Sequence, residues 1–283
     1  MKNVKVILWG LGAMGGGIGK MLTKKKGVDI VGAIDIGDKI GKSLYDVVPG
    51  IVKGDREDVI VGTPEEVIKP GAADIVVVCT NSFTKDVFDK LVFVMERGMN
   101  VITSAEEMAY PQAQEPELAK KLDEIAKKNG VSVMGTGINP GLIMDLLVVL
   151  WTAACEEVNH VTSRRVNSLS PFGPAVMEEQ GIGISVEEFN ERKANGTMAG
   201  HVGFAESTMM ICDALGWKWD DFGQDMEPIV TDVDRKSPYG FAAAGQVAGV
   251  AMKGWVNIDG ERKIDMDHPQ QIEPEQVGVH TGD

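Results

Sequence analysis

Short apolar runs alternate with amphipathic stretches through the first half of the chain. The apolar runs predict strands at residues 4–9, 28–35, 59–61, 74–79, 100–103 and 131–134. Stretches with helical periodicity predict helices at residues 18–26, 64–68, 84–96 and 116–128. Strands rich in Val and Ile that alternate with helices are typical of a parallel sheet with both faces covered. We therefore expect an α/β fold in which residues 1–138 form a Rossmann domain with a doubly wound parallel sheet.

The pattern changes in the second half of the chain. Helices are predicted at residues 142–154, 187–195 and 204–215, and strands at residues 158–167, 227–232, 245–257 and 263–268. Asp259-Gly260, between the last two strands, is a typical hairpin turn. Hairpins combined with helices indicate an α+β substrate domain with a mixed sheet over residues 139–283. Residues 268–283 are polar and contain no obvious helix or strand that would return the chain to the first domain. This pattern would be expected if a C-terminal segment were missing.

A glycine cluster lies between the first predicted strand and the first predicted helix. Gly-x-Gly-x-x-Gly in this context is the pattern of dinucleotide-binding loops. The first glycine permits a tight turn, the second lets the backbone approach the pyrophosphate, and the third lets helix and strand pack closely. The helix N-terminus then offers N–H groups and a partial positive charge to the phosphates. The cofactor-binding residues expected here are Gly10, Leu11, Gly12, Ala13, Met14 and Gly15.

Asp35 ends the second predicted strand, twenty residues after Gly15. A carboxylate there can accept hydrogen bonds from the adenosine ribose hydroxyls and repels a 2′-phosphate, so it favours NAD over NADP. Lys39 and Lys42 lie nearby, and either could meet a 2′-phosphate, so NADP stays an alternative. A second alternative is that Asp35 merely caps the next helix.

Thr80 and Asn81 follow the fourth predicted strand. The carboxyl ends of parallel strands line the cofactor side of such a sheet. We therefore expect both residues to hydrogen-bond the pyrophosphate or the nicotinamide ribose. Alternatively, Asn81 caps the helix that begins near Phe83.

Two adjacent carboxylates, Glu106 and Glu107, follow the fifth predicted strand at the same edge of the sheet. Their neighbours Ala105, Met108 and Ala109 are apolar, and poor solvation would raise the pKa of a carboxyl group and make it a usable proton carrier. Adjacent residues point in different directions, so we expect only one of the two to face the cleft. The alternative is a surface helix whose dipole favours two acids in its first turn.

Polar residues also stand out further along the chain. Asn139 follows the sixth predicted strand, where it is expected to cap the next helix and could also face the cofactor. In the long strand predicted after residue 158, alternation places Arg165 and Asn167 on one face and Arg164 and Val166 on the other.

The chain is acidic, with 42 acidic and 28 basic residues and a net charge of −14. Nucleic acids and anionic membranes would require a basic face, so the charge argues against both as partners. Cys79, Cys155 and Cys212 each lie in an apolar stretch, and we expect buried, reduced thiols in a cytoplasmic protein. The spacing of Cys and His in the sequence indicates no metal site.

Segments from across the whole chain resemble the 2,4-diaminopentanoate dehydrogenases. This family is related to the native amine dehydrogenases, and its fold is similar to that of dihydrodipicolinate reductase. The glycine loop is shared by many enzymes, whereas the segments around Glu106 and Arg165 are much more specific. The matching segments are Trp9 to Gly15, Ala105 to Pro111, Gly137 to Gly141, Arg165 to Asn167 and Met266 to Gln270.

The resemblance implies oxidative deamination of 2,4-diaminopentanoate at C4 during ornithine degradation. The products would be 2-amino-4-oxopentanoate, ammonia and reduced cofactor. Relatives accept both NAD and NADP, and folds of this kind are often homodimers. Family members continue past Gly282-Asp283. Three alternatives stay open: an amine dehydrogenase acting on simple ketones, a reductase similar to dihydrodipicolinate reductase, and a catalytically silent nucleotide-sensing protein.

The reaction requires a proton carrier, and we assign this role to Glu106, with Glu107 as the alternative. By the resemblance, Arg165 holds the substrate carboxylate, for which a planar bidentate donor is suited. Arg165 could instead form a surface ion pair. The other substrate-binding residues that the resemblance implies are Asn139, Asn167 and His268. His268 could instead be a turn residue before Pro269.

Overall fold

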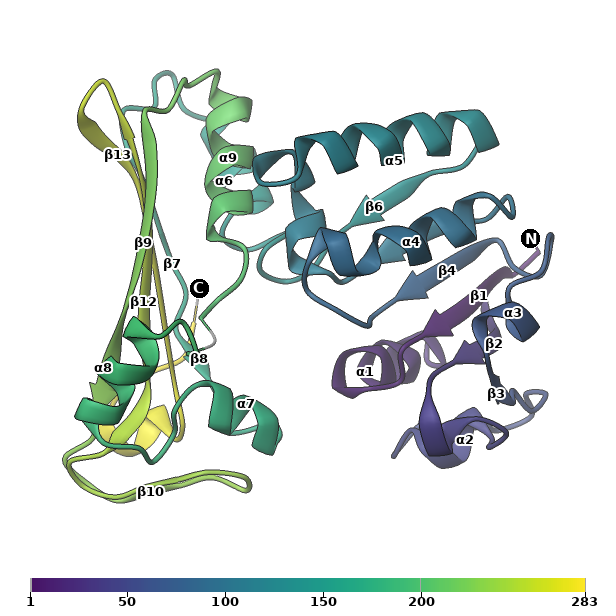
Figure 1. The fold of residues 1–283 in the computed structure, drawn as a ribbon, viewed down its shortest axis with the longest axis horizontal. Coiled ribbons are helices and arrows are strands. Elements are labelled where there is room, and N and C mark those ends of the chain that lie inside the picture. Colours follow the sequence, from purple (N-terminus) through teal and green to yellow (C-terminus); the bar gives the residue numbers. More distant parts are fainter. Residues whose placement is uncertain (1, 199, 283) are drawn as a thin grey trace. The chain divides into compact units, whose positions relative to one another are not determined.

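The computed structural model describes residues 2–198 and 200–282. The chain divides into two compact units, Met1–Gly141 and Leu142–Asp283. In Figure 1 the first unit runs from purple to teal, and the second runs from teal through green to yellow.

A six-stranded sheet forms the centre of the first unit, in the order β3-β2-β1-β4-β5-β6. Every neighbouring pair of strands is parallel. The doubly wound sheet predicted from the alternation of strands and helices is therefore confirmed. The strands are β1 (Val4–Trp9), β2 (Val28–Ile34), β3 (Val61–Gly62), β4 (Ile75–Val78), β5 (Asn100–Thr103) and β6 (Val133–Gly135).

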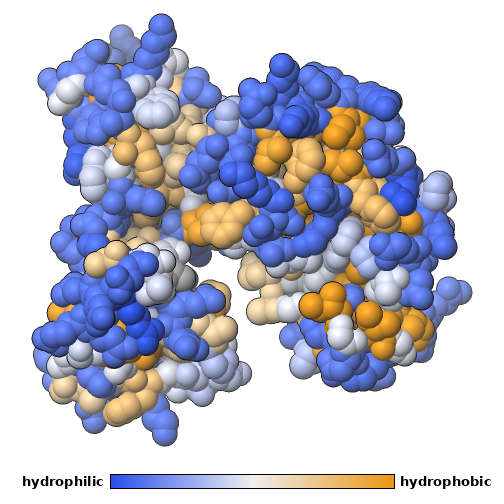
Figure 2. Space-filling model, in the orientation of Figure 1, coloured by the Kyte–Doolittle hydropathy of each residue, from blue (hydrophilic) through white to orange (hydrophobic). Residues whose placement is uncertain are grey.

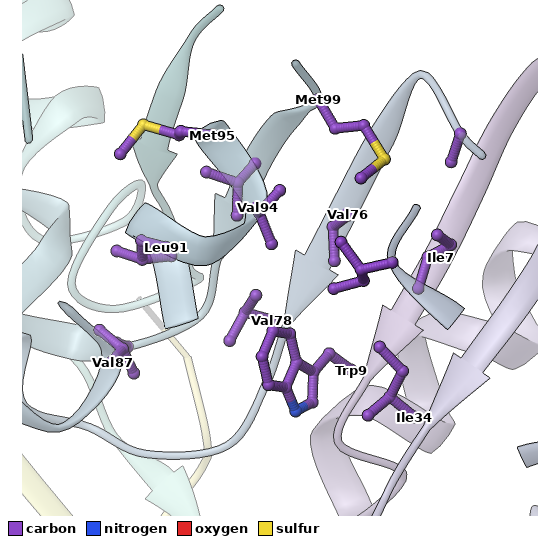
Figure 3. Packing of buried hydrophobic residues seen from close by; sticks show 14 of the residues in the cluster. Ile7, Trp9, Ile34, Val76, Val78, Val87, Leu91, Val94, Met95 and Met99 are labelled. Atoms are coloured by element: carbon purple, nitrogen blue, oxygen red, sulfur yellow. The ribbon is translucent and has the colours of Figure 1, made fainter. Parts of the chain in front are cut away.

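Helices cover both faces of this sheet. They are α1 (Ala13–Leu22), α2 (Leu44–Val47), α3 (Pro64–Val67), α4 (Thr84–Met95) and α5 (Pro116–Asn129), with 3-10 helices η1 (Gly37–Lys39), η2 (Glu106–Ala109) and η3 (Pro111–Ala113). Successive side chains of β1 enter different clusters: Ile7 and Trp9 pack with α4 and α5, whereas Val6 and Leu8 pack on the side of α1. Figure 3 shows the fully buried Leu91 of α4 in the first of these clusters.

A mixed five-stranded sheet forms the second unit, in the order β7-β13-β12-β9, with β8 also paired to β13. The two short strands run parallel to β13, and the others are antiparallel. This confirms the mixed sheet predicted for this half of the chain. The strands are β7 (Val161–Arg164), β8 (Asn167–Ser168), β9 (Asp221–Val230), β12 (Val247–Ile258) and β13 (Glu261–Gln271), and β10 (Arg235–Lys236) pairs with β11 (Phe241–Ala242).

Local sequence explains two contacts in the second unit. Asp259 and Gly260 have positive φ angles of 52° and 73°, as the predicted hairpin turn between β12 and β13 requires. A Cβ at Gly254 would lie 2.8 Å from the Phe204 side chain, so this glycine lets a helix pack closely on β12. The helices are α6 (Leu146–Thr152), α7 (Pro174–Glu179), α8 (Val186–Ala194), α9 (Phe204–Leu215) and η4 (Pro274–Val277).

The first helix differs from the prediction. It begins at Ala13 rather than at residue 18, so the glycines that follow the loop lie inside its first turns. Glycine destabilises a helix by about 0.5–1 kcal/mol relative to alanine. For this reason the sequence predicts that the helix begins only after the glycines. Close packing requires the glycine at position 15, because a Cβ at Gly15 would lie 1.8 Å from the Gly10 carbonyl oxygen.

Three further expectations are wrong. The helix predicted at residues 142–154 is the shorter α6, and Asp145 caps it in place of Asn139, its carboxylate accepting the Leu146 N–H at 2.6 Å. The strand predicted at residues 158–167 is divided into β7 and β8, and between them the Val166 N–H bonds the Gly282 carbonyl at 2.7 Å. Cys155, expected to be buried, is exposed just beyond the end of α6.

Candidate functional site

The glycine loop between β1 and α1 has the shape that a dinucleotide requires. Gly10 has a φ of +96°, and a Cβ there would lie 2.5 Å from the Cys79 carbonyl oxygen, so the turn needs glycine. A Cβ at Gly12 would meet nothing within 4 Å, which leaves open space where a pyrophosphate can approach the backbone. The loop leads directly into the N-terminus of α1. These residues therefore fit a dinucleotide cofactor.

Asp35 holds this loop through its carboxylate. Oδ2 accepts the Leu11 N–H and Oδ1 accepts the Ile36 N–H, both at 2.7 Å. The Lys39 ammonium lies 2.8 Å from Oδ2 and also donates to the Leu11 carbonyl. Burial acts to raise the pKa of Asp35, but Lys39 and the two N–H groups outweigh it and hold the pKa below its usual value. The carboxylate is thus ionised at neutral pH.

Thr80 and Asn81 lie just beyond the end of β4, and both bind the ammonium group of Lys90. The Lys90 ammonium of α4 donates to Thr80 Oγ1 at 2.9 Å and to Asn81 Oδ1 at 2.6 Å. Thr80 also lies against the glycine loop, since a Cβ at Gly10 would be 3.1 Å from its Cγ2. Phe83, rather than Asn81, occupies the N-cap position of α4. Lys90 was not predicted, because nothing in the helical pattern distinguishes it from a surface lysine.

Glu107 is buried and bound to the start of α4. Its Oε2 accepts the Thr84 N–H at 2.7 Å, and its own N–H donates to the Ser82 carbonyl. A carboxylate at a helix N-terminus satisfies a backbone donor and interacts favourably with the helix dipole. Glu107 therefore has a structural role in joining η2 to α4.

Glu106 begins η2 and is half-buried. A Cβ at Gly135 would lie 1.9 Å from the Met108 carbonyl oxygen, so this glycine lets η2 lie against the end of β6. Just before η2, the Ser104 N–H donates to the Val78 carbonyl at the end of β4. Glu106 is thus held at the carboxyl edge of the sheet, the edge at which Thr80 lies.

Asn139 lies in the tight turn that follows β6, also at the carboxyl edge of the sheet. It is half-buried and belongs to the first unit. A Cβ at Gly137 would lie 2.7 Å from the Pro140 carbonyl oxygen, and Gly141 has a φ of +123°. Glycines are therefore needed to bring this turn back on itself.

One sheet register brings Arg165, Asn167 and His268 together in the second unit. The short strands β7 and β8 pair with β13 in one continuous register. Arg164 of β7 pairs with Asp267, and Asn167 of β8 pairs with Gln270. His268 is buried, and its Nδ1 lies 2.9 Å from the Arg165 carbonyl oxygen. Because a carbonyl can only accept, Nδ1 carries a proton and donates to it.

Arg164 and Arg165 have different surroundings. The exposed Arg164 forms an ion pair with Asp267, with 2.9 Å between Nε and Oδ2. The Arg165 side chain interacts electrostatically with His201. This difference agrees with the alternation that places the two arginines on opposite faces of the strand.

His201 is a further member of this cluster that sequence reasoning missed. Its ring packs edge-on against His268, with 4.9 Å between centroids and 81° between planes. Burial, together with His268 and Arg165, lowers the pKa of His201 to about 3, so the ring is neutral at working pH. The residue lies outside any regular helix or strand, so periodicity carried no signal for it.

The described residues contain neither a metal-binding cluster nor a membrane-spanning helix. Among residues 2–198 and 200–282, no group of His, Cys, Asp and Glu side chains is arranged to hold a metal ion. Over the same residues, no helix has the length and apolar character needed to cross a membrane. Figure 2 shows a largely hydrophilic surface with separate apolar patches.

Sequence comparison identifies close relatives of the chain. Residues 142–283 match the family model of the 2,4-diaminopentanoate dehydrogenase C-terminal domain. The chain is 68% identical over 284 residues to a 2,4-diaminopentanoate dehydrogenase of Acetoanaerobium sticklandii, and the match covers 100% of this chain and 80% of that protein.

Solved structures are also similar. An amine dehydrogenase from Mycobacterium smegmatis shares 26% sequence identity with a TM-score of 0.78, over 96% of this chain and 80% of that chain. GenD2 from gentamicin A biosynthesis, solved in complex with NAD, shares 17% identity with a TM-score of 0.53, over 96% of this chain and 66% of that chain. At 17% identity the likeness concerns the fold alone.

Proposed function

Because the chain belongs to the 2,4-diaminopentanoate dehydrogenase family, we propose that it catalyses the oxidative deamination of 2,4-diaminopentanoate at C4. Substrate, oxidised nicotinamide cofactor and water would yield 2-amino-4-oxopentanoate, ammonium, reduced cofactor and a proton. The 68% identity over the whole chain is the observation that carries this proposal. The similarity to an amine dehydrogenase supports the same class of reaction.

The glycine loop and the edge formed by Thr80 and Asn81 are proposed to hold the cofactor. When bound, the nicotinamide accepts the hydride from C4 of the substrate. The Asp35 carboxylate offers acceptors to ribose hydroxyls, which favours NAD. The Lys39 ammonium beside it offers a partner to a 2′-phosphate, which admits NADP. We therefore expect both cofactors to be used, with a preference for NAD.

Glu106 is proposed to move the protons. The substrate ammonium must lose a proton before hydride leaves C4, and hydrolysis of the resulting imine moves protons between water and the leaving amine. The half-buried position of Glu106 at the carboxyl edge of the sheet supports this role. The bond between the Glu107 carboxylate and the Thr84 N–H argues against Glu107.

Arg165 is proposed to bind the substrate carboxylate through two parallel N–H···O bonds. His201 supports this role, because its neutral ring adds no second positive charge beside the guanidinium. His268, whose ring bonds the Arg165 carbonyl, is proposed to line the same polar pocket. Asn139 and Asn167 stay predicted hydrogen-bonding partners for the same end of the substrate.

The direct test is to follow reduced-cofactor absorbance with NAD and NADP separately, against 2,4-diaminopentanoate, ornithine, lysine and a simple amine. We expect turnover with 2,4-diaminopentanoate far above turnover with the other three compounds. A higher rate with the simple amine would instead favour a general amine dehydrogenase, the second candidate, which the similarity to the Mycobacterium smegmatis enzyme supports. Cofactor binding without reduction by any of the four would contradict both enzymes.

Three finer points stay predictions from the sequence. They are the place of the reaction in ornithine degradation, the cytoplasmic location and the homodimer.

A further inference from the structure

Lys90 connects two residues at the carboxyl end of β4. Its half-buried ammonium donates both to Thr80 Oγ1 and to Asn81 Oδ1, at 2.9 and 2.6 Å. Burial lowers the pKa of Lys90, while the Asp86 carboxylate acts in the opposite direction. Lys85, one turn earlier on the same helix, is exposed and instead pairs with Glu115. Lys90 is therefore not an ordinary surface lysine.

Lys90 determines which hydrogen-bonding groups of Thr80 and Asn81 remain available to a ligand. An ammonium can only donate, so each partner must face it with an acceptor. Thr80 accepts through its hydroxyl oxygen, which leaves the hydroxyl proton to donate elsewhere. Asn81 accepts through its carbonyl oxygen, which leaves the two N–H groups of the amide to donate. Without the lysine, either side chain could rotate and present an acceptor instead.

Thr80 lies beside the glycine loop. A Cβ at Gly10 would lie 3.1 Å from Thr80 Cγ2. Gly10 is in the turn just before Gly12, where the structure leaves open space. The groups that a dinucleotide presents along such a strand edge are mainly acceptors, namely phosphate, ribose and carboxamide oxygens. Two fixed donors match these oxygens, whereas two acceptors would oppose them.

We propose that Lys90 is a positioning residue for the dinucleotide, which holds Thr80 and Asn81 with their donors available to it. This role rests on the proposed cofactor site. It is separate from the glycine loop and Asp35, which Lys90 does not contact through any hydrogen bond found in the described residues. Loss of the lysine should therefore weaken cofactor binding while the loop stays intact.

The test measures the dissociation constant of NADH by fluorescence titration of the whole chain, without substrate, together with the thermal midpoint. Lys90→Met should raise the dissociation constant at least about tenfold, equivalent to about 1.4 kcal/mol. Lys90→Arg should restore part of the affinity, because guanidinium also only donates. Lys85→Met, the matched control on the same helix, should leave the dissociation constant unchanged.

A double-mutant cycle separates positioning from direct attraction of the phosphates. In a chain that carries Thr80→Val and Asn81→Ala, adding Lys90→Met should produce no further weakening. If Lys90→Met weakened NADH binding equally in the unsubstituted chain and in the Thr80→Val, Asn81→Ala chain, the positioning role would be overturned. A Lys90→Met variant with a lower thermal midpoint but an unchanged NADH dissociation constant would also overturn it. Failure of the unsubstituted chain to bind NADH would overturn the proposed function, whereas equal binding by that chain and Lys90→Met overturns only the role of Lys90.

Discussion

The carboxylates of Glu106 and Glu107 are adjacent in the chain and differ in what they contact. Glu107 is buried and accepts a backbone N–H at the start of α4. Glu106 is half-buried at the beginning of η2. From the sequence we predict that only one of the pair faces the cleft, and we assign the proton carrier to Glu106 with Glu107 as the alternative. The distinguishing contact is with Thr84, 23 positions away, so no local pattern contains it.

Glu106→Gln should lower turnover at least about a hundredfold, because the variant loses its general acid and base. Steady-state rates with 2,4-diaminopentanoate measure this loss, and the thermal midpoint should hardly change. Glu107→Ala is the control. It should cost about 1–3 kcal/mol of unfolding free energy, because the Thr84 N–H loses its partner, while turnover per folded molecule stays within a few-fold. The opposite pattern would make Glu107 the proton carrier.

Arg165→Met should raise the Michaelis constant for 2,4-diaminopentanoate by about tenfold to a hundredfold, since hydrogen bonds to charged groups contribute about 1.5–3 kcal/mol. The ratio kcat/KM should change little for a simple amine, because that substrate has no carboxylate to bind. Measuring both substrates with the same preparation makes the comparison. Equal losses on the two would indicate that Arg165 stabilises the fold rather than the substrate.

Among helices and strands, local pattern predicted bounds best where the periodicity and the stop signal are both clear. The structure has β1, β5 and α9 with the predicted bounds, because each combines a clear periodicity with a clear stop. The prediction of α1 failed at its start, because tertiary packing there overrides the low helix propensity of glycine.

Long-range pairing explains the remaining differences. Between β7 and β8 the Val166 N–H bonds the Gly282 carbonyl, and the ring of His201 packs against the ring of His268. Neither contact has a local signature. For the candidate site, the sequence thus located the glycine loop, Asp35 and the carboxylate pair, whereas Lys90 and His201 required the fold.

Gly15→Ala should abolish measurable NADH binding, because its Cβ would lie 1.8 Å from the Gly10 carbonyl oxygen and must displace the loop from α1. Gly17→Ala is the matched control in the same helix, since a Cβ there meets nothing within 4 Å. It should retain the protein's fold and raise stability by about 0.5–1 kcal/mol. Fluorescence titration and thermal unfolding of both variants test this. Unchanged NADH affinity in Gly15→Ala would contradict the assigned role of the loop.

The whole molecule should respond to acid through the buried histidine. Folding lowers the pKa of His201 from 6.5 to about 3, because of burial and the nearby His268 and Arg165. Between these values the unfolded chain binds a proton that the folded chain does not. Stability is therefore unaffected by this residue above pH 6.5 and decreases as the pH falls towards 3.

Urea unfolding between about pH 5 and 7.5 measures this effect, in a range where most carboxylates stay ionised. The unfolding free energy of the unsubstituted chain should fall with acid by up to about 1.4 kcal/mol per pH unit below 6.5. His201→Gln should remove this slope. His160→Gln, which changes an exposed histidine near Asp265, should retain it. An identical slope in His201→Gln and the unsubstituted chain would show that another group is responsible.

The parallel pairing of β7 and β8 with β13 has a consequence for the order of events on the ribosome. The bond between His268 and Arg165 joins positions 103 residues apart, and β13 ends only at Gln271. All strands of the first sheet, in contrast, have been synthesised by Gly135. A nascent chain can therefore complete the cofactor-binding sheet while Arg165 still lacks the strand that holds it. The carboxylate-binding role proposed for Arg165 therefore becomes available only after β13 has been synthesised, and until then β7 has no partner strand in this sheet.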